Sequence, residues 1–251
     1  MDIITSRKNP NIQHLRRLAS DRAYRRSTGE FLCDGSKLLE EALQNFAEIT
    51  GIYTRENKKC VVPDDIRHIC LSDDVFDYAS PLENSPGPLF TVHIPHWECT
   101  AVPRSVLVLE NVQDPGNIGT VLRSAAAMGV QWIILVGGCA DPYNPKCVRG
   151  AMGALFRQKW METDAQGLAG LLRQWDLPLR GAALLPDSRD VRSGPLFPGA
   201  VAVGNEGKGL TQELLKICDE KIIIPMTPGS ESFNAAVAAS VLMWEMMREN
   251  L

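Results

Sequence analysis

The second half of this sequence lacks histidine. All four histidines, His14, His68, His93 and His96, lie before residue 97. Their absence from the second half argues against a Ser-His-Asp hydrolase and against histidine acid–base catalysis there. The loops of this half also lack paired carboxylates suited to a metal ion. We therefore expect no metal site, and we expect Arg, Glu, Asn and Ser side chains to carry the chemistry.

Cysteine pairs and long apolar runs are missing as well. No two cysteines form a CxxC pair, and their odd number and wide scatter argue against a zinc site or a disulfide framework. No apolar run is long enough to span a membrane, and "MDIITSRKNP" lacks the pattern of a secretory signal. We therefore expect a cytoplasmic protein without a membrane partner. The seven cysteines are Cys33, Cys60, Cys70, Cys99, Cys139, Cys147 and Cys218.

Charge is distributed unevenly along the chain. The 251 residues carry a net charge of −4, yet residues 1–30 hold seven basic and three acidic side chains, and residues 31–103 hold five basic and twelve acidic. A basic segment on an acidic protein suits contact with RNA phosphates, although a solvated helix face explains the charge equally well. The predicted RNA-binding residues are Arg7, Lys8, Arg16, Arg17, Arg22, Arg25 and Arg26.

Residues 1–100 mix helix and strand patterns. Ile12, Leu15 and Leu18 give one apolar face to the helical segment "NIQHLRRLASDRAYRRS", and "EFLCDG" predicts a short strand before the amphipathic helix "SKLLEEALQNF". After the loop "SPLENSPGP", a last strand leads into a connecting segment. We place the boundary between two domains near residues 100–104, which gives domains of residues 1–100 and 104–251.

Short apolar runs alternate with helical segments from residue 105 onward. The runs "SVLVLE", "WIILVG", "GAALLP", "AVAVGN" and "KIIIPM" are rich in β-branched residues, and helices are predicted at 118–129, 165–175 and 211–218. This alternation is typical of a parallel sheet that helices cover on both faces. The sequence therefore predicts an α/β fold for the second domain.

The last helical segment is apolar on nearly all sides. Between Phe233 and Met247, only Asn234, Ser240 and Glu245 interrupt the apolar residues. Such a helix must be covered on more than one side. A central core helix would satisfy this pattern, but a terminal helix fits better between its own sheet and a partner subunit, so we expect a homodimer.

Three loops rich in Gly, Pro and small polar residues follow predicted strands. They are "NVQDPGNIGTVLR" (111–123), "VGNEGKGL" (203–210) and "IPMTPGSESFN" (224–234). In an open parallel sheet, ligands bind beyond the carboxyl ends of the strands, and such loops bring backbone groups close to a ligand. None of them has the spacing of a P-loop or of a G-x-G-x-x-G dinucleotide site, which argues against an ordinary Rossmann nucleotide-binding enzyme.

These three loops, in this order, resemble the signature motifs of the SpoU/TrmH class of RNA 2′-O-ribose methyltransferases in the SPOUT superfamily. The resemblance covers residues 104–251, and three ordered motifs make it specific. The N-terminal "ITSRKNPNIQHLRRL…GEFLCDGSKLLEEAL" is similar, more loosely, to the small α/β RNA substrate-binding domain of this class.

The resemblance implies a methyl transfer from S-adenosylmethionine to a ribose 2′-hydroxyl of RNA, ribosomal RNA by analogy. It also implies an obligate homodimer and a C-terminal segment threaded into a trefoil knot, which is a rare exception among folds. Phe233 stands where the class more often has Leu, a change that keeps an apolar wall. The catalytic residues that the resemblance implies are Arg123, Asn117, Glu206, Ser232 and Asn234. The cofactor-binding residues that we predict are Leu184, Gly204, Asn205, Glu206, Gly207, Ile224, Met226, Ser232 and Phe233, with Pro225 in the same loop.

Arg123 is the predicted residue that faces the RNA. Arginine normally stays protonated, so we expect its guanidinium to grip a phosphate beside the target ribose and stabilise developing negative charge. The class also allows a deprotonated arginine that acts as the base. For Asn117, Ser232 and Asn234 a helix-capping role is an alternative. Glu206 either accepts backbone N–H bonds in its loop or offsets the sulfonium charge of the donor.

Two other functions remain open at this point. The chain could methylate transfer RNA instead of ribosomal RNA, or it could be a non-catalytic RNA-binding or ribosome-assembly protein that retains the fold. The complete set of Asn117, Arg123, Glu206, Ser232 and Asn234 favours an enzyme.

Overall fold

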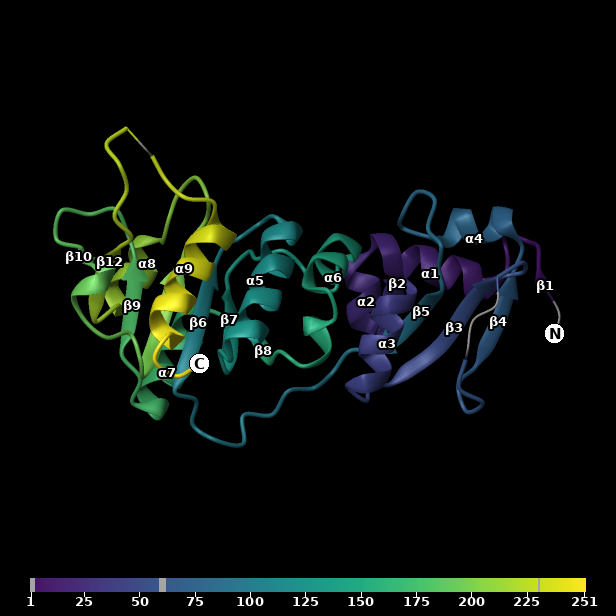
Figure 1. Ribbon diagram of the computed structural model, residues 1–251, viewed down its shortest axis with the longest axis horizontal. Helices are drawn as coiled ribbons and strands as arrows, with labels where there is room; N and C mark the ends of the chain where they lie inside the picture. Colours follow the sequence, from purple (N-terminus) through teal and green to yellow (C-terminus); the bar gives the residue numbers. More distant parts are fainter. Residues whose placement is uncertain (1–2, 59–61, 230) are drawn as a thin grey trace. The chain divides into compact units, whose positions relative to one another are not determined.

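The structure, a computed structural model, describes residues 3–58, 62–229 and 231–251 (Figure 1). The chain forms two compact units. The first contains the residues up to His96 together with Asp141–Phe156, and the second contains Trp97–Ala140 and Arg157–Leu251. Residues 141–156 thus pack with the first unit, although they lie within the sequence range predicted for the second domain. The chain therefore passes between the units three times.

The first unit is built around a small sheet. In its described part, five strands lie in the order β1-β4-β3-β5-β2, and β5 runs antiparallel to its neighbours β2 and β3. The elements are β1 (Ile3–Ile4), α1 (Pro10–Ser20), α2 (Arg22–Thr28), β2 (Glu30–Asp34), α3 (Ser36–Gln44), β3 (Ile49–Arg55), β4 (His68–Leu71), α4 (Asp73–Ala79), β5 (Leu89–His93), α6 (Pro145–Ala151) and the 3-10 turn η1 (Ala154–Phe156). The apolar face predicted for the first helix is confirmed, because Ile12, Leu15 and Leu18 are fully buried.

The predicted first helical segment is two helices. Asp21 ends α1 and caps α2, because its side chain accepts a hydrogen bond from the backbone N–H of Tyr24 (3.0 Å). Asp is a favoured residue at such a cap. The helical periodicity continues across this position, so it did not reveal the break.

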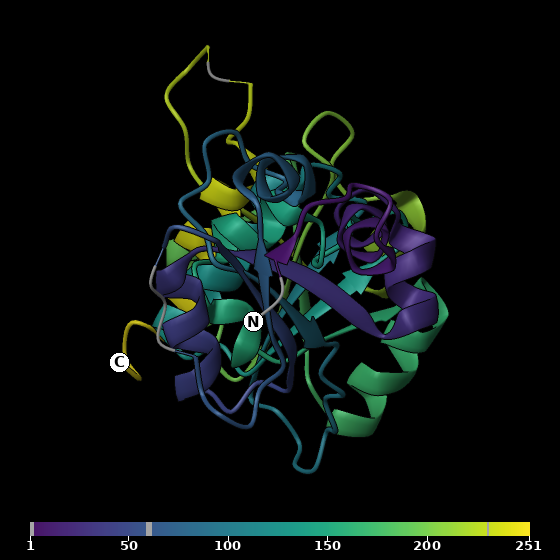
Figure 2. The ribbon, with the colours of Figure 1, turned by 90° about the vertical axis from the view of Figure 1, so that its right-hand side faces the viewer.

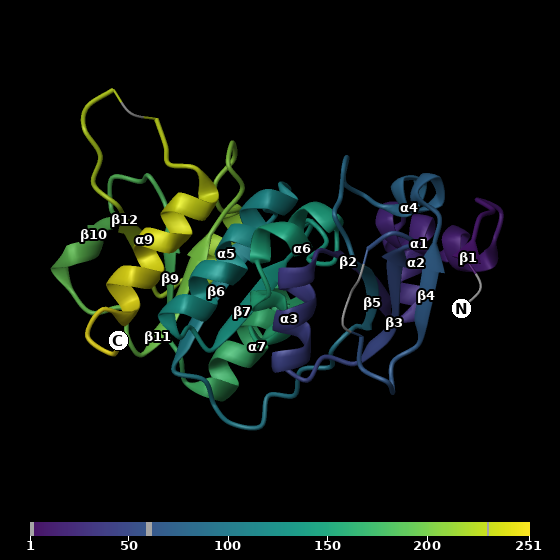
Figure 3. The ribbon, with the colours of Figure 1, turned by 45° about the vertical axis from the view of Figure 1, so that its right-hand side comes forward.

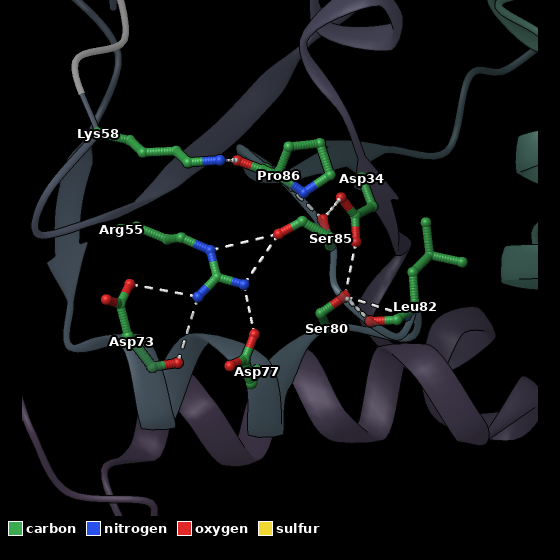
Figure 4. Close-up of polar contacts among 10 residues, drawn as sticks. Asp34, Arg55, Lys58, Asp73, Asp77, Ser80, Leu82, Ser85 and Pro86 are labelled. Carbon is green, nitrogen blue, oxygen red and sulfur yellow. Dashed lines mark hydrogen bonds and ion pairs between the residues drawn. The ribbon is translucent and has the colours of Figure 1, made fainter.

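A partly buried polar cluster holds the loop at residues 80–88 (Figure 4). The carboxylate of Asp34 accepts hydrogen bonds from the hydroxyls of Ser80 (2.7 Å) and Ser85. The Arg55 guanidinium donates to the Ser85 carbonyl (2.8 Å) and pairs with Asp73 and Asp77. Burial raises the pKa of Asp34, and the hydrogen bonds from the Ser85 and Ser80 hydroxyls act in the opposite direction. Asp34 is the last residue of β2 and Arg55 is the last residue of β3, so these two side chains fix the loop to the ends of both strands.

The second unit contains a parallel sheet, as predicted. Among the described residues, seven strands lie in the order β10-β12-β9-β11-β6-β7-β8, and every pairing is parallel. The elements are β6 (Ser105–Glu110), α5 (Pro115–Met128), β7 (Trp132–Val136), β8 (Trp160–Thr163), α7 (Ala165–Trp175), β9 (Leu179–Ala182), β10 (Arg189–Asp190), the 3-10 turn η2 (Val191–Ser193), β11 (Gly199–Val203), α8 (Gln212–Ile217), β12 (Glu220–Ile223) and α9 (Ala235–Met247).

Most predicted elements of this unit match the structure, and one strand is displaced. The run "GAALLP" was expected to form a strand at 181–186, but β9 begins at Leu179 and ends at Ala182. Leu179 is buried while Leu184 is 57% exposed, so burial rather than the apolar run decides where this strand lies. Leu184 therefore lies in the loop after β9. The short strands β8 and β10 were not predicted.

Helix α9 packs against α5, β6 and β11, and Figures 1 and 3 show α5 and α9 beside each other. The Ser240 hydroxyl on α9 donates to that of Ser124 on α5 (3.2 Å). Three apolar residues on the opposite side, Val237, Val241 and Trp244, are 37–54% exposed. Helix α9 is thus covered on one side within the described chain. Within the described residues, no helix is long and apolar enough to cross a membrane.

Candidate active site

The three predicted motif loops meet at the carboxyl edge of the second unit's sheet. The side-chain amide of Asn117, in the first turn of α5, donates to a carboxylate oxygen of Glu206 in the loop after β11 (2.7 Å). The amide of Asn234, at the start of α9, donates to the Asn117 Oδ1 (3.1 Å). One hydrogen-bonded chain, Asn234–Asn117–Glu206, therefore joins residues that are 89 and 117 positions apart. Figures 1 and 2 draw the loops after β11 and before α9 on the same side of this unit.

Helix α5 begins at Pro115, and its cap is Asp114. The Asp114 side chain accepts from the backbone N–H of Gly116 (2.6 Å), and Pro at the first helical position lacks an N–H that would need a partner. The alternative that Asn117 caps this helix is therefore wrong. Because Asp114 takes that role, the Asn117 amide is available to bridge the other two loops.

Asn234 is a cap as well as a bridge. Its Oδ1 accepts from the backbone N–H groups of Ala236 (2.9 Å) and Val237 (3.3 Å), while its amide nitrogen donates to Asn117. The predicted cap role of Asn234 is thus confirmed, and the same side chain also bonds Asn117. Ser232 is exposed and is not the cap of α9.

The loop after β11 is a tight hairpin. The backbones of Asn205 and Gly209 form a pair of hydrogen bonds (2.9 and 3.1 Å), and Gly204 lies against Gly209 so closely that a Cβ there would be 2.2 Å from its carbonyl carbon. The Asn205 Oδ1 accepts the N–H groups of Gly207 and Lys208 (3.0 and 3.1 Å). Asn205, and not Glu206 as one alternative had it, therefore orders the tip, and Glu206 is left to bond Asn117.

Two residues at the end of β6 that we did not predict also contact this hairpin. The carboxylate of Glu110, 3% exposed, accepts from the backbone N–H (2.7 Å) and the hydroxyl (2.6 Å) of Thr211. The carbonyl of Asn111 accepts from the side-chain amide of Asn205 (3.0 Å). A polar pair that directly follows the apolar run "SVLVL" was the available signal for both residues.

The remaining predicted cofactor residues follow neighbouring strands. Leu184 follows β9, and Ile224 and Met226 follow β12; β9 lies between β12 and β11 in the sheet. Ile224 and Met226 are half-buried, while Leu184 (57%) and Phe233 (39%) are exposed apolar side chains. Ser230, within the third motif, lies outside the described residues.

Arg123 lies apart from the amide chain. It is exposed on α5, six residues beyond Asn117, which is about 9 Å along a helix axis. Within the described chain, no hydrogen bond or ion pair is found for its guanidinium. The structure thus joins Asn117, Glu206 and Asn234, and it does not bring Arg123 or Ser232 into that chain.

The basic N-terminal residues differ in their surroundings. The guanidinium of Arg16 lies 5.0 Å from the ring centre of Tyr78, and that of Arg17 lies 3.7 Å from the ring centre of Tyr24. Arg7 also contacts Tyr78 and pairs with Asp74, which offsets its charge. Lys8 and Arg26 are exposed, and Arg22 is half-buried.

Arg25 does not have the exposure predicted for an RNA-binding residue. It is 2% exposed, and its guanidinium donates twice to the carboxylate of Asp141 (2.6 and 2.8 Å) and once to the carbonyl of Leu18 (2.6 Å). A buried charge is retained only with such partners. Arg25 therefore holds the segment that begins at Asp141 to α2, and it has no free edge for a phosphate.

Sequence and structure comparisons identify the family. Residues 104–244 match the model of the SpoU rRNA Methylase family, and residues 9–89 match that of the MRM3-like substrate binding domain. The chain belongs to the SpoU rRNA methylase family. The resemblance found in the three motifs is thereby confirmed. Within the described residues, no group of His, Cys, Asp or Glu side chains is arranged to hold a metal ion.

Several SpoU relatives match over nearly their full length. The chain is 31% identical to the 23S rRNA (guanosine(2553)-2′-O)-methyltransferase RlmP of Bacillus subtilis, over 98% of this chain and 99% of the relative. It is 27% identical to the 23S rRNA (uridine(2479)-2′-O)-methyltransferase of Streptomyces viridochromogenes, over 99% and 92%.

Solved structures of the family have the same fold. A crystal structure of an RNA 2′-O ribose methyltransferase is similar with a TM-score of 0.83 and 29% identity, and 99% of each chain is covered. The SpoU methyltransferase AviRb from Streptomyces viridochromogenes, solved in complex with AdoMet, is similar with a TM-score of 0.86 and 25% identity, over 96% of this chain and 98% of that one.

Proposed function

We propose that this protein transfers a methyl group from S-adenosylmethionine to a ribose 2′-hydroxyl of ribosomal RNA. The observation that carries this proposal is the hydrogen-bonded chain Asn234–Asn117–Glu206, which joins all three family motifs at the edge of the sheet where ligands bind. The two relatives described above, each matched over nearly its full length, are both named for ribosomal RNA, which favours ribosomal over transfer RNA.

The motif loops fit the two ends of the cofactor. Bound S-adenosylmethionine supplies a methyl group on a positively charged sulfur. The missing Cβ of Gly204 lets the hairpin close on Gly209, which places Asn205, Glu206 and Gly207 beyond the end of β11, and Leu184 and Phe233 offer exposed apolar surface for an adenine ring. Ile224, Met226 and Ser232 complete the set of residues that we propose to hold the cofactor.

Glu206 and Asn117 have linked roles in this proposal. The Glu206 carboxylate stabilises the positive charge of the donor, and Asn117 fixes its position by donating to Oε1 (2.7 Å). Asn234 in turn fixes Asn117 (3.1 Å). Positioning of this kind accounts for a large part of the barrier reduction in well-oriented reactions, about 7–11 kcal/mol.

Arg123 is proposed to grip the RNA phosphate beside the target ribose and to stabilise negative charge that develops on the 2′-oxygen. Its exposed guanidinium suits a bidentate contact with a phosphate. A phosphate oxygen or a water molecule then takes the proton of the hydroxyl. The alternative within the family is a deprotonated arginine that takes the proton itself.

Helix α9 is proposed to form a homodimer interface. Val237, Val241 and Trp244 follow each other at intervals of four and three residues, so they share one face of the helix, and all three are exposed. An exposed apolar face of this kind marks an association surface. We expect Trp244→Glu to lower the mass measured by analytical ultracentrifugation from dimer to monomer, and an unchanged mass would argue against this interface.

The first unit is proposed to bind the RNA substrate. Its match to a substrate-binding domain and the stacked guanidinium groups of Arg16 and Arg17 support this role, and Arg7, Lys8, Arg22 and Arg26 extend the surface. Arg25 is left out because its guanidinium is buried and paired.

We also propose the family's trefoil knot for the C-terminal segment and a cytoplasmic site of action. The support is the membership in this family, and the chain after β12, which pairs with β9, returns to pack α9 against α5. A crystal structure traced through residues 199–251 tests the knot. Cell fractionation followed by immunodetection tests the site of action.

Two measurements test the proposed activity. Calorimetry with S-adenosylmethionine and with ATP is expected to give binding of the first and none of the second. Mapping of 2′-O-methyl groups in ribosomal and transfer RNA, from cells with and without the protein, is expected to show a lost ribosomal site. Binding of ATP alone would exclude the methyltransferase function, and a lost transfer RNA site would replace the substrate.

A further inference from the structure

Glu110 is a buried carboxylate that the family motifs leave without a role. It is 3% exposed at the carboxyl end of β6, and its two hydrogen-bond donors are both groups of Thr211. Removing a carboxylate from water is costly unless hydrogen bonds compensate it. A neutral apolar side chain would pack at this strand end at lower cost, so the charge points to a specific task.

Thr211 lies two residues after Gly209, on the C-terminal side of the hairpin that carries Glu206. Its hydroxyl donates to Glu110 (2.6 Å) and accepts from the backbone N–H of Leu214 (3.2 Å), which caps α8. Its own N–H also donates to Glu110 (2.7 Å). The chain on the C-terminal side of the hairpin is thereby fixed to β6.

Asn111 fixes the other side of the same hairpin. Its carbonyl accepts from the side-chain amide of Asn205 (3.0 Å), and its own Oδ1 accepts from the backbone N–H of Gly138 (2.7 Å). Its φ of 55° is in the left-handed region, which is uncommon for a residue other than glycine. In this conformation the Asn111 carbonyl bonds Asn205 while the Asn111 side chain bonds Gly138.

We propose that Glu110 and Asn111 are positioning residues for the methyl transfer, and that they act by fixing both ends of the hairpin that carries Glu206. Asn111 fixes the start at Asn205, and Glu110 fixes the end at Thr211. With both ends fixed, the Glu206 carboxylate stays within hydrogen-bond distance of Asn117. The inference rests on the proposed function, because it concerns the same site, and a displacement of about 1 Å is enough to impair a positioned reaction.

The charge of Glu110 strengthens both of its hydrogen bonds, because each carboxylate oxygen accepts from a donor group of Thr211. A carboxylate accepts charge-assisted bonds on both oxygens, whereas a glutamine has one acceptor oxygen for the Thr211 N–H, and its amide N–H faces the Thr211 hydroxyl, which then has to accept instead of donate. Glu110→Gln therefore keeps the volume and replaces the charge-assisted bond from the Thr211 hydroxyl by a reversed, neutral one, which weakens the attachment of this end of the hairpin. Thr211→Ser keeps both donors and the cap of α8, whereas Thr211→Val keeps the backbone N–H and loses both the hydroxyl bond to Glu110 and the cap of α8.

Steady-state methylation of ribosomal RNA by the full-length protein tests the inference. We expect Glu110→Gln and Thr211→Val each to lower kcat/KM for S-adenosylmethionine by at least about tenfold, which corresponds to the loss of one charge-assisted hydrogen bond. Thr211→Ser is expected to retain near-normal kcat/KM. The control is Glu213→Gln, which changes an exposed carboxylate two residues beyond Thr211 and is expected to change nothing.

A double-mutant cycle separates positioning from a general structural role. If Glu110 acts through the hairpin, Glu110→Gln adds little to the loss already caused by Glu206→Gln, because the carboxylate that it positions is gone. Additive losses in the double variant, or full activity of both Glu110→Gln and Thr211→Val, would overturn the inference. If Glu110→Gln does not fold, the same cycle is measured with Thr211→Val. Failure of the wild-type protein to bind S-adenosylmethionine would instead overturn the proposed function.

Discussion

Arg25 and Arg55 in the first unit and Glu206 in the second unit have different kinds of partner. In the first unit, Arg25 is surrounded by Asp141 and the carbonyl of Leu18, and Arg55 by Asp73, Asp77 and the carbonyl of Ser85, so these charges stabilise the unit itself. In the second unit, Glu206 bonds a neutral amide, and within the described residues no cation pairs with its carboxylate. A paired charge holds a fold together, whereas an unpaired charge in a polar site is available to a ligand.

Removal of Arg25 tests the structural side of this comparison and is expected to have the largest effect. Arg25→Ala leaves Asp141 without its cation in a nearly buried position, so we expect a loss of about 3–5 kcal/mol of unfolding free energy, measured by urea denaturation. The control is Arg192→Ala, which breaks the solvent-exposed pair with Asp190 and is expected to leave the unfolding free energy nearly unchanged. Equal losses for the two variants would contradict the structural role of Arg25.

Arg123→Lys tests the functional side. The substitution keeps the positive charge and loses the bidentate fork, so we expect kcat to fall by about a hundredfold while the Kd for S-adenosylmethionine stays unchanged. Methylation assays and calorimetry give the two values. Arg173→Lys on α7 is a matched change at another exposed helix position and is expected to be neutral. Near-normal turnover of Arg123→Lys would exclude the bidentate grip.

Arg16 and Arg17 test whether stacked arginines in the first unit are free for RNA. Each contacts a tyrosine ring, and an arginine that stacks in this way keeps its edge for a phosphate. We expect Arg16→Gln or Arg17→Gln to weaken binding of protein-free large-subunit ribosomal RNA by about tenfold and to reduce the salt slope of log Kd by about one.

Filter binding at several salt concentrations measures both quantities. Lys216→Gln, at an exposed position on α8, is the control and is expected to leave the slope unchanged. If Arg16→Gln and Arg17→Gln also leave the slope unchanged, these arginines belong with Arg25 as structural residues, and the proposed RNA surface lies elsewhere.

An ion pair at the outer edge of the second sheet is expected to show the smallest effect. Arg189 donates two hydrogen bonds to Glu220 (2.5 and 2.9 Å), and this contact lowers the pKa of the Glu220 carboxyl below its ordinary value of 4.5. A lowered folded-state pKa contributes stability that is present above the unfolded-state pKa and is lost as the pH falls through the folded-state pKa.

We therefore expect Glu220→Gln to lower the urea midpoint at pH 7 and to reduce its decline below about pH 4.5. The side chain is 37% exposed, so solvent screening limits the contribution to under about 1 kcal/mol. The control is Glu249→Gln at an exposed position near the C-terminus. A Glu220→Gln midpoint that declines with acid as steeply as that of the wild type would show that the pair contributes no pH-dependent stability.

The sequence predicted the parts of the site that depend on neighbouring residues. β-branched runs gave the strands β6, β7, β11 and β12, and the three Gly- and Pro-rich loops gave the family. Helix caps were harder to predict, because Asp114 and Asn117 are both residues that favour caps, and only the hydrogen bond to Gly116 distinguishes them. The strand at "GAALLP" was displaced because apolar character alone does not say which leucine is buried.

Contacts between distant residues could not be predicted in this way. Glu110 and Thr211 are 101 positions apart, and Arg25 and Asp141 are 116 apart. Neither pair has a sequence pattern that would couple its members, and the burial of Arg25 contradicted the expectation from its basic neighbours. The assignment of residues 141–156 to the first unit also depends on such contacts.

By itself the sequence determined the parallel α/β architecture, the family and the order of its motifs, because periodicity and turn chemistry act over a few residues. Only the tertiary structure decided that Asn117 bridges Glu206 and Asn234, that Glu110 holds Thr211, and that Arg25 is internal. The partners at the site are set when parallel strands bring their carboxyl ends to one edge, and the burial of Arg25 is set when the segment from Asp141 packs with the first unit. Both arrangements exist only in the folded chain.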